Sequence, residues 1–279
     1  QAALGRGIGR GHYDVGWHNT STIGCIGAAA SCARLLALSP EATRDALGLA
    51  VSMASGPKVQ FGSPAKPFHA GLAAQHGVLA AELARQGTHA RPDAIEGERG
   101  FIDLFAGSDQ TDWHGLLDRL GQPLAIAEFG VSPKLYPCCG STHRVLDGVL
   151  ALRAAHGLTL GDVERVHTLV GYGNKRNLCY PEPRDEMEGR FSMNYCVAVA
   201  LNFGKLSLGD FTAKAIHRSD LRSFLPRVEM DARAEGAEGD DPASRLPHEI
   251  TICLTNGREL RRDVHEAKGS ASNPLTSAD

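Results

Sequence analysis

Small apolar residues fill the first half of the chain in long runs that lack the alternation of strands. The continuous, alanine-rich run 23–37 predicts a helix buried on most of its sides. Ser39 and Pro40 are typical of a helix cap and of the first helical position, and Gly56 is a natural stop. The helices expected in this half cover residues 23–37, 40–55, 69–86, 100–106 and 112–120.

The pattern changes near residue 125, after which short apolar stretches alternate with polar ones. The run 163–172 alternates and is rich in valine, which is typical of a strand. Asn256 and Gly257 separate two further alternating runs and predict a hairpin with a type I′ turn. We expect extended segments at 125–129, 134–136, 163–172, 226–231, 249–254 and 258–264, helices at 141–155 and 190–203, and a polar surface loop at 232–247. The predicted elements therefore indicate a helical part joined to an α+β part, with a boundary between residues 125 and 134. Clefts between two such parts often bind ligands.

The amino-acid composition excludes some classes of protein. A chain of 279 residues with 42% hydrophobic and 22% charged residues can form one large domain or two modest ones. Net charge is −3 and aromatic residues are only 6%, so neither a basic surface nor stacking side chains support nucleic-acid binding. No apolar stretch is long enough to span a membrane.

The seven cysteines are odd in number and lack a C-x-x-C pair. The spacing therefore fits neither a zinc ribbon nor an iron–sulfur cluster, and it favours free thiols in a reducing, cytoplasmic setting.

Lys66 lies in a segment with unusual local chemistry. Pro64 and Pro67 push the residues before them towards extended conformations, so we expect Lys66 on a rigid non-helical segment before a helix that starts at His69. A lysine and a helix N-terminus together attract an anion. The alternative is a loop whose lysine is merely solvated.

Two further segments place a histidine near a helix start. His18 precedes the run 23–37, and His143 lies in the first turn of the helix expected at 141–155. Burial there favours a neutral imidazole that can act as a base. Each signal alone is weak, because a single histidine is more often structural and the hydroxyls of Thr20 to Thr22 can serve as helix caps. The apolar run 190–203 also contains a polar pair, Asn194 and Tyr195.

Taken together and in this order, these segments resemble the MmgE/PrpD family, which includes 2-methylcitrate dehydratase, cis-aconitate decarboxylase and iminodisuccinate epimerase. The resemblance covers essentially the whole chain. It rests on residues 16–20, 65–71, 136–143, 190–195, 268–270 and 273–275.

The resemblance implies an α+β fold: a large all-helical domain with a smaller α+β lid domain inserted into it. Residues 1–130 would belong to the helical domain and residues 131–266 to the lid, while residues 267–279 would return to the helical domain. It also implies a homodimer that needs no metal or organic cofactor. Family members carry a further Asp/Thr/His motif in an N-terminal helical segment that precedes the first motif found here. We therefore expect either a fragment or a degenerate member, and in the second case an inactive one.

The resemblance further implies an active site made of His18, Lys66, His143 and Tyr195. Lys66, His69, Thr20 and Ser141 would contact the substrate. In this family the substrates are small di- or tricarboxylates. Lys66 would hold a carboxylate, a histidine would move the proton α to it, and Tyr195 would help to stabilise the developing charge.

The implied activity is that of a cofactor-independent lyase, a dehydratase or a decarboxylase, in reactions such as those of propionate metabolism. Two alternatives remain open: an epimerase of an amino- or imino-dicarboxylate on the same scaffold, and an inactive truncated member. The residues quoted above do not distinguish which histidine is the acid and which is the base.

Overall fold

The structure is a computed structural model that describes residues 1–106, 113–118, 120–238 and 245–277. The chain divides into two compact units, Gln1–Glu128 and Phe129–Asp279, and each is described by itself below. Among the described residues, no helix has both the length and the apolar character needed to cross a membrane.

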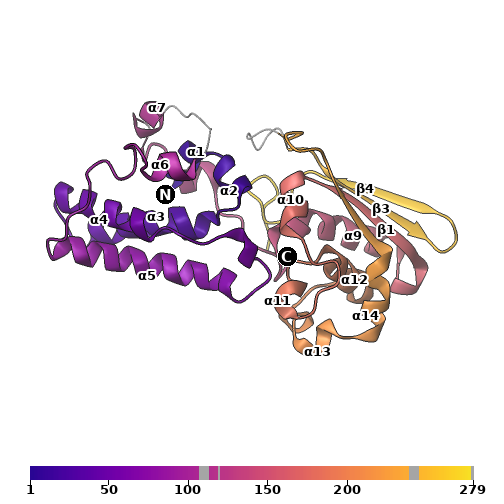
Figure 1. The fold of residues 1–279 in the computed structure, drawn as a ribbon. Coiled ribbons are helices and arrows are strands. Elements are labelled where there is room, and N and C mark those ends of the chain that lie inside the picture. Colours follow the sequence, from indigo (N-terminus) through magenta and orange to yellow (C-terminus); the bar gives the residue numbers. More distant parts are fainter. Residues whose placement is uncertain (107–112, 119, 239–244, 278–279) are drawn as a thin grey trace. The chain divides into compact units, whose positions relative to one another are not determined.

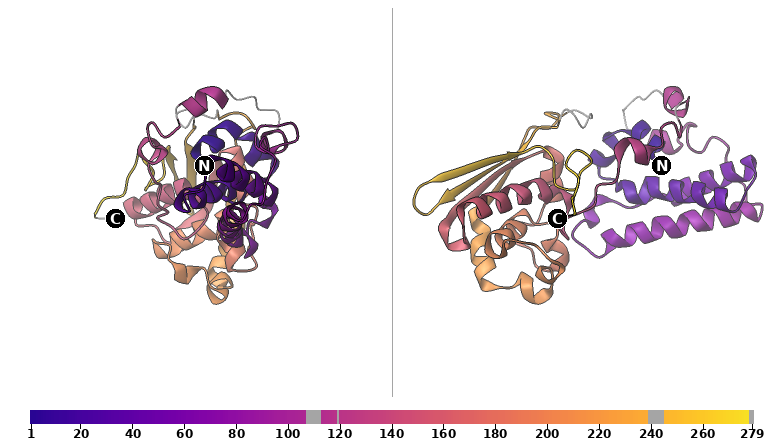
Figure 2. Two further views of the ribbon diagram at one scale, coloured as in Figure 1. Left: turned by 90° about the vertical axis from the view of Figure 1, so that its left-hand side faces the viewer. Right: turned by 180° about the vertical axis from the view of Figure 1, so that it is seen from behind.

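The first unit is helical, and three long helices, α3, α4 and α5, lie side by side in it (Figures 1 and 2). Small side chains let them approach closely: a Cβ on Gly77 would lie only 2.4 Å from the Cβ of Ala28. The core of this unit is correspondingly rich in alanine. The helices are α1 (Ala2–Ile8), α2 (Gly11–Val15), α3 (Asn19–Leu35), α4 (Pro40–Met53), α5 (Ala65–Arg85), α6 (Phe101–Phe105), α7 (Trp113–Asp118) and α8 (Ala125–Phe129), with a 3-10 turn η1 (Lys58–Gln60).

The helices predicted in this half are confirmed at their centres. Ser39 caps α4 as expected, since its side chain accepts a hydrogen bond from the backbone N–H of Ala42. The predicted helix at 112–120 corresponds to α7, and its residues 112 and 119 lie outside the described residues.

The conformation predicted for Lys66 is wrong. Helix α5 begins at Ala65, so Lys66 and Pro67 belong to its first turn. Proline is tolerated there because the first backbone N–H groups of a helix have no partner within the helix. The predicted end is right: α5 stops at Arg85, and Gly87 follows with a φ of 88°.

The second unit combines helices with one mixed four-stranded sheet in the order β2-β1-β3-β4. β1 pairs with β2 in parallel and with β3 antiparallel, and β4 pairs antiparallel with β3. The strands are β1 (Val163–Val170), β2 (Val228–Ala232), β3 (His248–Leu254) and β4 (Glu259–Val264). The helices are α9 (His143–His156), α10 (Tyr172–Asn177), α11 (Glu186–Gly189), α12 (Met193–Phe203), α13 (Ala213–Ile216) and α14 (Ser219–Phe224), with 3-10 turns η2 (Gly140–Thr142), η3 (Leu160–Asp162), η4 (Leu208–Asp210) and η5 (Leu225–Arg227).

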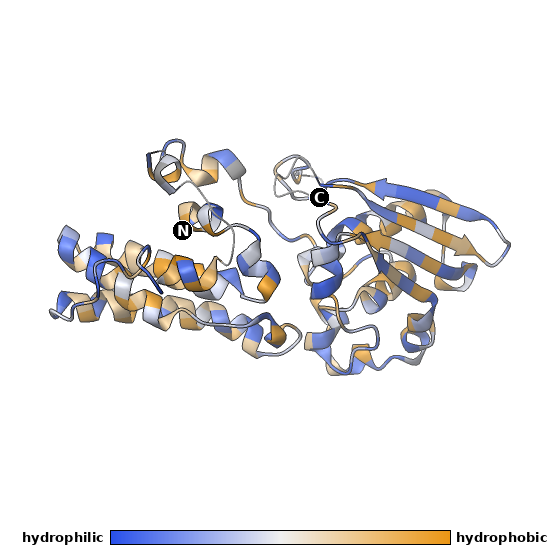
Figure 3. Cartoon of the chain, turned by 45° about the horizontal axis from the view of Figure 1, so that its top comes forward, coloured by the Kyte–Doolittle hydropathy of each residue, from blue (hydrophilic) through white to orange (hydrophobic). Residues whose placement is uncertain are grey.

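Hydrophobic residues of the sheet line up across the strands. Val166 on β1 is the register partner of both Val228 on β2 and Ile252 on β3. Hydrophobic and hydrophilic bands alternate along β3 and β4 in Figure 3, and alternate residues of β3 are buried. Helices α9 and α12 pack against each other and against this sheet. The apolar runs at 190–203 and 249–254 thus form the core of the second unit, as their patterns indicate.

Three local predictions in this half are wrong. Residues 125–129 form helix α8, and no strand forms at 134–136. Both segments lack a neighbouring strand that could pair with them. The hairpin between β3 and β4 is confirmed, but its turn is not type I′, because among the described non-glycine residues only Ala37 and Arg99 have positive φ. Only Gly257, with a φ of 81°, adopts the left-handed conformation in a three-residue loop. Residues 239–244 of the predicted loop 232–247 lie outside the described residues.

The predicted α+β class with a helical domain is confirmed. The predicted limits at 130/131 and 266/267 stay predictions. In the structure the units divide after Glu128. The segment that starts at residue 267 contacts the second unit, because the backbone N–H of Lys268 donates to Asp147 Oδ2 over 2.7 Å.

Candidate active site

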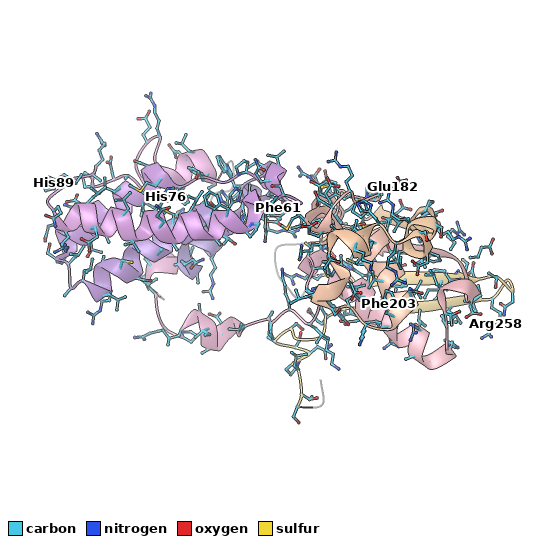
Figure 4. The ribbon with its side chains drawn as sticks, turned by 90° about the horizontal axis from the view of Figure 1, so that it is seen from below. Phe61, His76, His89, Glu182, Phe203 and Arg258 are labelled. Atoms are coloured by element: carbon cyan, nitrogen blue, oxygen red, sulfur yellow. The ribbon has the colours of Figure 1, made fainter. Side chains whose placement is uncertain are left out.

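Two of the predicted histidines lie side by side in the first unit. Nδ1 of His18 is 3.2 Å from Nδ1 of His69, and both side chains are buried. His18 directly precedes α3, and His69 lies in the first turns of α5, so the packing of these two helices brings the imidazoles together. Figure 4 labels Phe61 near this end of α5 and His89 at the opposite end. The rings of Phe61 and His18 are nearly perpendicular, with the ring centroids 5.1 Å apart.

Gly56 allows the chain to pass close to this pair. The backbone N–H of His18 donates to the carbonyl of Gly56 over 2.9 Å, which ties the start of α3 to the segment after α4. Gly56 has a φ of 110°, and a Cβ at this position would lie 2.5 Å from Ser21 Oγ and 3.2 Å from His69 Nδ1. A larger residue would therefore force Ser21 to shift and would crowd the imidazole of His69.

The two imidazoles are held neutral. Burial, reinforced by the charge of Lys66, lowers the pKa of His18 to about 4, and the same two causes lower the pKa of His69. Between two neutral rings, one Nδ1 carries a hydrogen and the other accepts it. The ring whose Nδ1 donates keeps a lone pair on Nε2, while the other ring carries its hydrogen there. The pair therefore offers one base and one acid at neutral pH.

Lys66 contributes a positive charge beside this pair. Its Nζ lies 5.6 Å from the centroid of the Phe61 ring, and its charge is among the causes that disfavour a second positive charge on His18 or His69. Lys66 also lies in the first turn of the long helix α5, where backbone N–H groups face outwards. This end of α5 therefore favours an anion.

A third histidine, His12, was missed by the sequence interpretation. It is fully buried; its Nδ1 contacts the carbonyl of Phe105 over 2.9 Å, and its Nε2 contacts Thr22 Oγ1 over 2.7 Å. Because a carbonyl only accepts, Nδ1 carries the hydrogen and Nε2 accepts from Thr22. Thr22 thus has a partner on His12 and does not act as the helix cap that the sequence suggested. The sequence around His12 has no periodic pattern that predicts a helix or strand, so nothing in the sequence interpretation drew attention to this residue.

His143 lies in the second unit at the first residue of α9. Its ring and that of Tyr136 are nearly perpendicular, with the centroids 5.1 Å apart. The Tyr136 hydroxyl donates to Asp147 Oδ1 over 2.6 Å. His143 is buried, and its Nε2 has no hydrogen-bond partner among the residues that the structure describes. A buried nitrogen without a partner is rare in proteins and is frequently explained by a functional role.

Cys138 is a buried thiol just before η2. Its Sγ lies 3.1 Å from Thr142 Oγ1, and hydrogen bonding from Cys196, His143 and Thr142 lowers its pKa below the usual range of a cysteine. Burial acts in the opposite direction. The sequence interpretation used the seven cysteines to judge metal-site spacing and the redox setting, and it did not single out Cys138.

The remaining predicted residues occupy different surroundings. Tyr195 is fully buried, its hydroxyl donates to the carbonyl of Asp210, and its ring packs on Phe211. Ser141 accepts a hydrogen bond from Asn177 Nδ2 over 3.2 Å. Thr20 lies exposed on α3. The catalytic role of Tyr195 and the substrate contacts of Ser141 and Thr20 stay predictions.

Asn194, the polar neighbour of Tyr195, has a structural role. Its Nδ2 donates to the carbonyls of Leu225 and Val228 and so ties α12 to the start of β2. No group of three or more histidine, cysteine or acidic side chains in the described part of the chain is arranged to hold a metal ion. The independence from metals stays a prediction.

Comparison with known proteins identifies the family of this chain. The model of the MmgE/PrpD N-terminal domain matches residues 1–114, and that of the MmgE/PrpD C-terminal domain matches residues 136–279. The chain is 28% identical to human cis-aconitate decarboxylase in an alignment that covers 94% of this chain and 54% of that protein. It is 27% identical to cis-aconitate decarboxylase of Aspergillus terreus over 214 residues, with 71% of this chain and 43% of the relative covered.

The same relation extends to a further fungal protein. The chain is 24% identical to the cis-aconitate decarboxylase-like protein oryM of Aspergillus oryzae, with 91% of the chain and 55% of the relative covered. The chain thus spans about half the length of the curated relatives that it matches. Because the two domain models together match most of its residues, the chain belongs to the MmgE/PrpD family.

Proposed function

We propose that the protein is a lyase that acts on a small di- or tricarboxylate, and that its reaction is the decarboxylation of a cis-aconitate-like substrate. The observation that carries this proposal is the pair of neutral histidines, His18 and His69, beside the positive charge of Lys66. The curated relatives, which are described as cis-aconitate decarboxylases, favour decarboxylation over dehydration.

Lys66 is suited to hold a carboxylate. An ammonium group forms a charge-assisted hydrogen bond with a carboxylate oxygen, and the N–H groups at the start of α5 add to the attraction. A bound anion next to the histidines would offset the positive charge that now disfavours their protonation. An imidazole could then take up a proton more easily when the substrate is present.

Decarboxylation needs a place for an electron pair and a source for a proton. When the carbon–carbon bond to one carboxylate breaks, carbon dioxide leaves and the electron pair stays on carbon. That charge is delocalised over the neighbouring double bond and carboxylate, where a cation such as Lys66 stabilises it. The imidazole N–H of the His18–His69 pair then protonates the carbon, and the pair regains its proton from water.

The same groups could remove a proton α to a carboxylate, which is the first step of both dehydration and epimerisation. The three reactions differ in their products, so an assay separates them. We expect the full protein to release carbon dioxide from cis-aconitate faster than it dehydrates 2-methylcitrate or epimerises iminodisuccinate. Turnover of 2-methylcitrate alone would instead identify a dehydratase, and activity on none of these substrates would contradict the proposal.

Lys66→Met tests the carboxylate anchor. We expect kcat/KM to fall on the order of 100-fold, or about 2.7 kcal/mol, as is typical when one partner of a buried charge pair is removed. Lys58→Met is the matched control, because Lys58 is the other lysine of the first unit and its Nζ already donates to the carbonyl of Tyr13 and lies over the Tyr13 ring. Equal losses in the two variants would remove the basis for this role of Lys66.

We also propose an oligomeric state and a cellular location. A homodimer follows from the resemblance to the family, and a cytoplasmic location follows from the cysteine usage.

A further inference from the structure

Phe61 adjoins both kinds of group that the proposed function uses. Its ring is nearly perpendicular to the imidazole of His18, with the centroids 5.1 Å apart, and Nζ of Lys66 lies 5.6 Å from its centroid (Figure 4). The side chains of Phe61 and His18 are both buried, each being only 6% exposed. One buried ring therefore borders a member of the histidine pair and the cation beside that pair.

The surroundings of Phe61 are unusual for a buried phenylalanine. In the part of the chain that the structure describes, buried hydrophobic residues form core clusters, and Phe61 belongs to none of them. A large apolar side chain that leaves water usually joins such a core. The ring of Phe61 instead meets His18 and Lys66. Phe61 is thus buried at the candidate site and not in the core of the first unit.

Hydrogen bonds fix the backbone on both sides of the turn that joins Phe61 to Lys66. The N–H of Phe61 donates to the carbonyl of Lys58 over 2.9 Å, and the N–H of Lys66 donates to the carbonyl of Ser63 over 3.1 Å. Gly62, with a φ of 88°, turns the chain between them. The ring and the ammonium therefore meet without the cost of ordering a loop.

An aromatic ring is suited to hold a cation that has to keep its charge. The face of a phenyl ring is negative and attracts an ammonium group within about 6 Å of its centroid. A carboxylate in the same place would form an ion pair with Lys66 and weaken its attraction for a substrate anion. The ring also keeps water from His18, and burial, ahead of the charge of Lys66, is the main cause that lowers the pKa of His18.

We propose that Phe61 is a positioning residue of the candidate site: its ring holds the ammonium of Lys66 beside the His18–His69 pair and shields His18 from water. This inference rests on the proposed function in so far as Lys66 binds a carboxylate and the pair transfers the proton. Phe61 itself forms and breaks no bond. It sets the separation between the anion anchor and the imidazoles, and a misplacement of about 1 Å in such a site can cost about 100-fold in rate.

The titration of His18 tests the proposal without any substrate. The full chain is labelled with ¹⁵N-histidine, the His18 signals are assigned by their loss in His18→Gln, and the pKa is read from their shift with pH. In Phe61→Leu we expect the pKa of His18 to rise by about one unit from its value of about 4, because water reaches the imidazole and the ammonium of Lys66 moves away. An unchanged pKa in Phe61→Leu would overturn the proposal.

Phe68→Leu is the matched control. Phe68 also lies near the start of α5, but its side chain is 62% exposed, so its replacement should leave the pKa of His18 in place. The other groups whose charge acts on His18 besides Lys66 are His69 on α5 and Lys58 on η1, and both variants keep them. Equal shifts in Phe61→Leu and Phe68→Leu would overturn the proposal.

A fluorinated phenylalanine at position 61 keeps the test decisive if Phe61→Leu does not fold. Fluorine withdraws electrons from the ring and weakens its attraction for a cation, while the shape of the ring changes little. We expect the pKa of His18 to rise with each added fluorine. The rise should vanish in Lys66→Met, where no ammonium is left to hold. A series without any rise, or a rise that persists in Lys66→Met, would overturn the proposal.

Kinetics give the second readout. In the fluorinated series we expect KM for the carboxylate substrate to rise, by up to about 10-fold, with little change in kcat, because the anchor loosens while the ring still covers His18. Phe61→Leu should lower kcat as well, and Phe68→Leu should change neither constant. An unchanged KM throughout the series would overturn the proposal. If the protein turns over none of the tested carboxylates, the proposed function fails, but the titration of His18 still decides the inference.

Discussion

Single polar groups in this chain are held by partners from distant parts of the sequence. Asp147 shows this most clearly, because Oδ1 accepts from the Tyr136 hydroxyl and Oδ2 accepts from the backbone N–H of Lys268. One carboxylate thus fixes both the ring that contacts His143 and the segment that follows β4. Two charge-assisted bonds make such a group costly to replace.

Asp147→Asn should release the segment around Lys268. An amide keeps only one accepting oxygen, so one of the two donors loses its partner, and the second unit should lose about 1–3 kcal/mol of stability. We expect the amide hydrogen of Lys268 to exchange markedly faster. Tyr136→Phe is the control, because it removes only the bond to Oδ1 and should leave exchange at Lys268 slow. Equal exchange rates in the two variants would contradict this account.

At the scale of elements, close helix packing in the first unit depends on the positions of particular glycines. Gly71 and Gly77 both lie on α5, but they face different surroundings. A Cβ at Gly77 would lie 2.4 Å from Ala28 Cβ and 2.7 Å from the backbone nitrogen of Ala29 on α3. At Gly71 there is no atom within 4 Å of such a Cβ. The same substitution should therefore have opposite effects at the two positions.

Gly71→Ala should stabilise the first unit by about 0.5–1 kcal/mol, because alanine is the better helix former. Gly77→Ala should destabilise it by about 1–3 kcal/mol, because α3 and α5 would be forced apart. Both tryptophans of the chain, Trp17 and Trp113, lie in the first unit, so urea unfolding followed by tryptophan fluorescence reports on this unit. A stabilising effect of Gly77→Ala would contradict this account, because it would show that α3 and α5 can move apart at little cost in free energy.

At the scale of the whole molecule, buried neutral histidines make stability depend on pH. Burial lowers the pKa of His12 and His18 in the first unit and that of His248 in the second, with values of about 4 for His18 and about 3 for His248. A histidine whose pKa is lower in the folded than in the unfolded protein takes up its proton first in the unfolded chain. Its stabilising contribution is therefore fully present above about pH 6.5 and is lost as the pH falls towards the folded pKa.

The free energy of unfolding of the first unit should thus decrease between about pH 6.5 and about pH 4, with about 2–3 kcal/mol from His18 alone. Urea unfolding followed by tryptophan fluorescence at several pH values measures this slope. His18→Gln should flatten it, because glutamine does not titrate. A slope that is the same in the variant would place the titrating group elsewhere.

Local patterns predicted much of this molecule correctly. The long helices, the strands β1 and β3, and the cap at Ser39 follow from periodicity and from capping chemistry, which act over a few residues. The same local rules failed at Lys66 and at 125–129. Proline at the start of a helix is compatible with two conformations, and a short apolar run becomes a strand only if another strand lies next to it.

The sequence by itself determined the family, the α+β class and the residue types with acid–base chemistry, because these depend on motifs and on local periodicity. Only the tertiary structure decided which of those residues meet. It placed His18 against His69 and gave Tyr195 a backbone partner on Asp210. Such contacts arise when helices and loops far apart in the chain pack together. The burial that this packing produces, absent from any local pattern, lowers the pKa of the buried histidines and keeps them neutral.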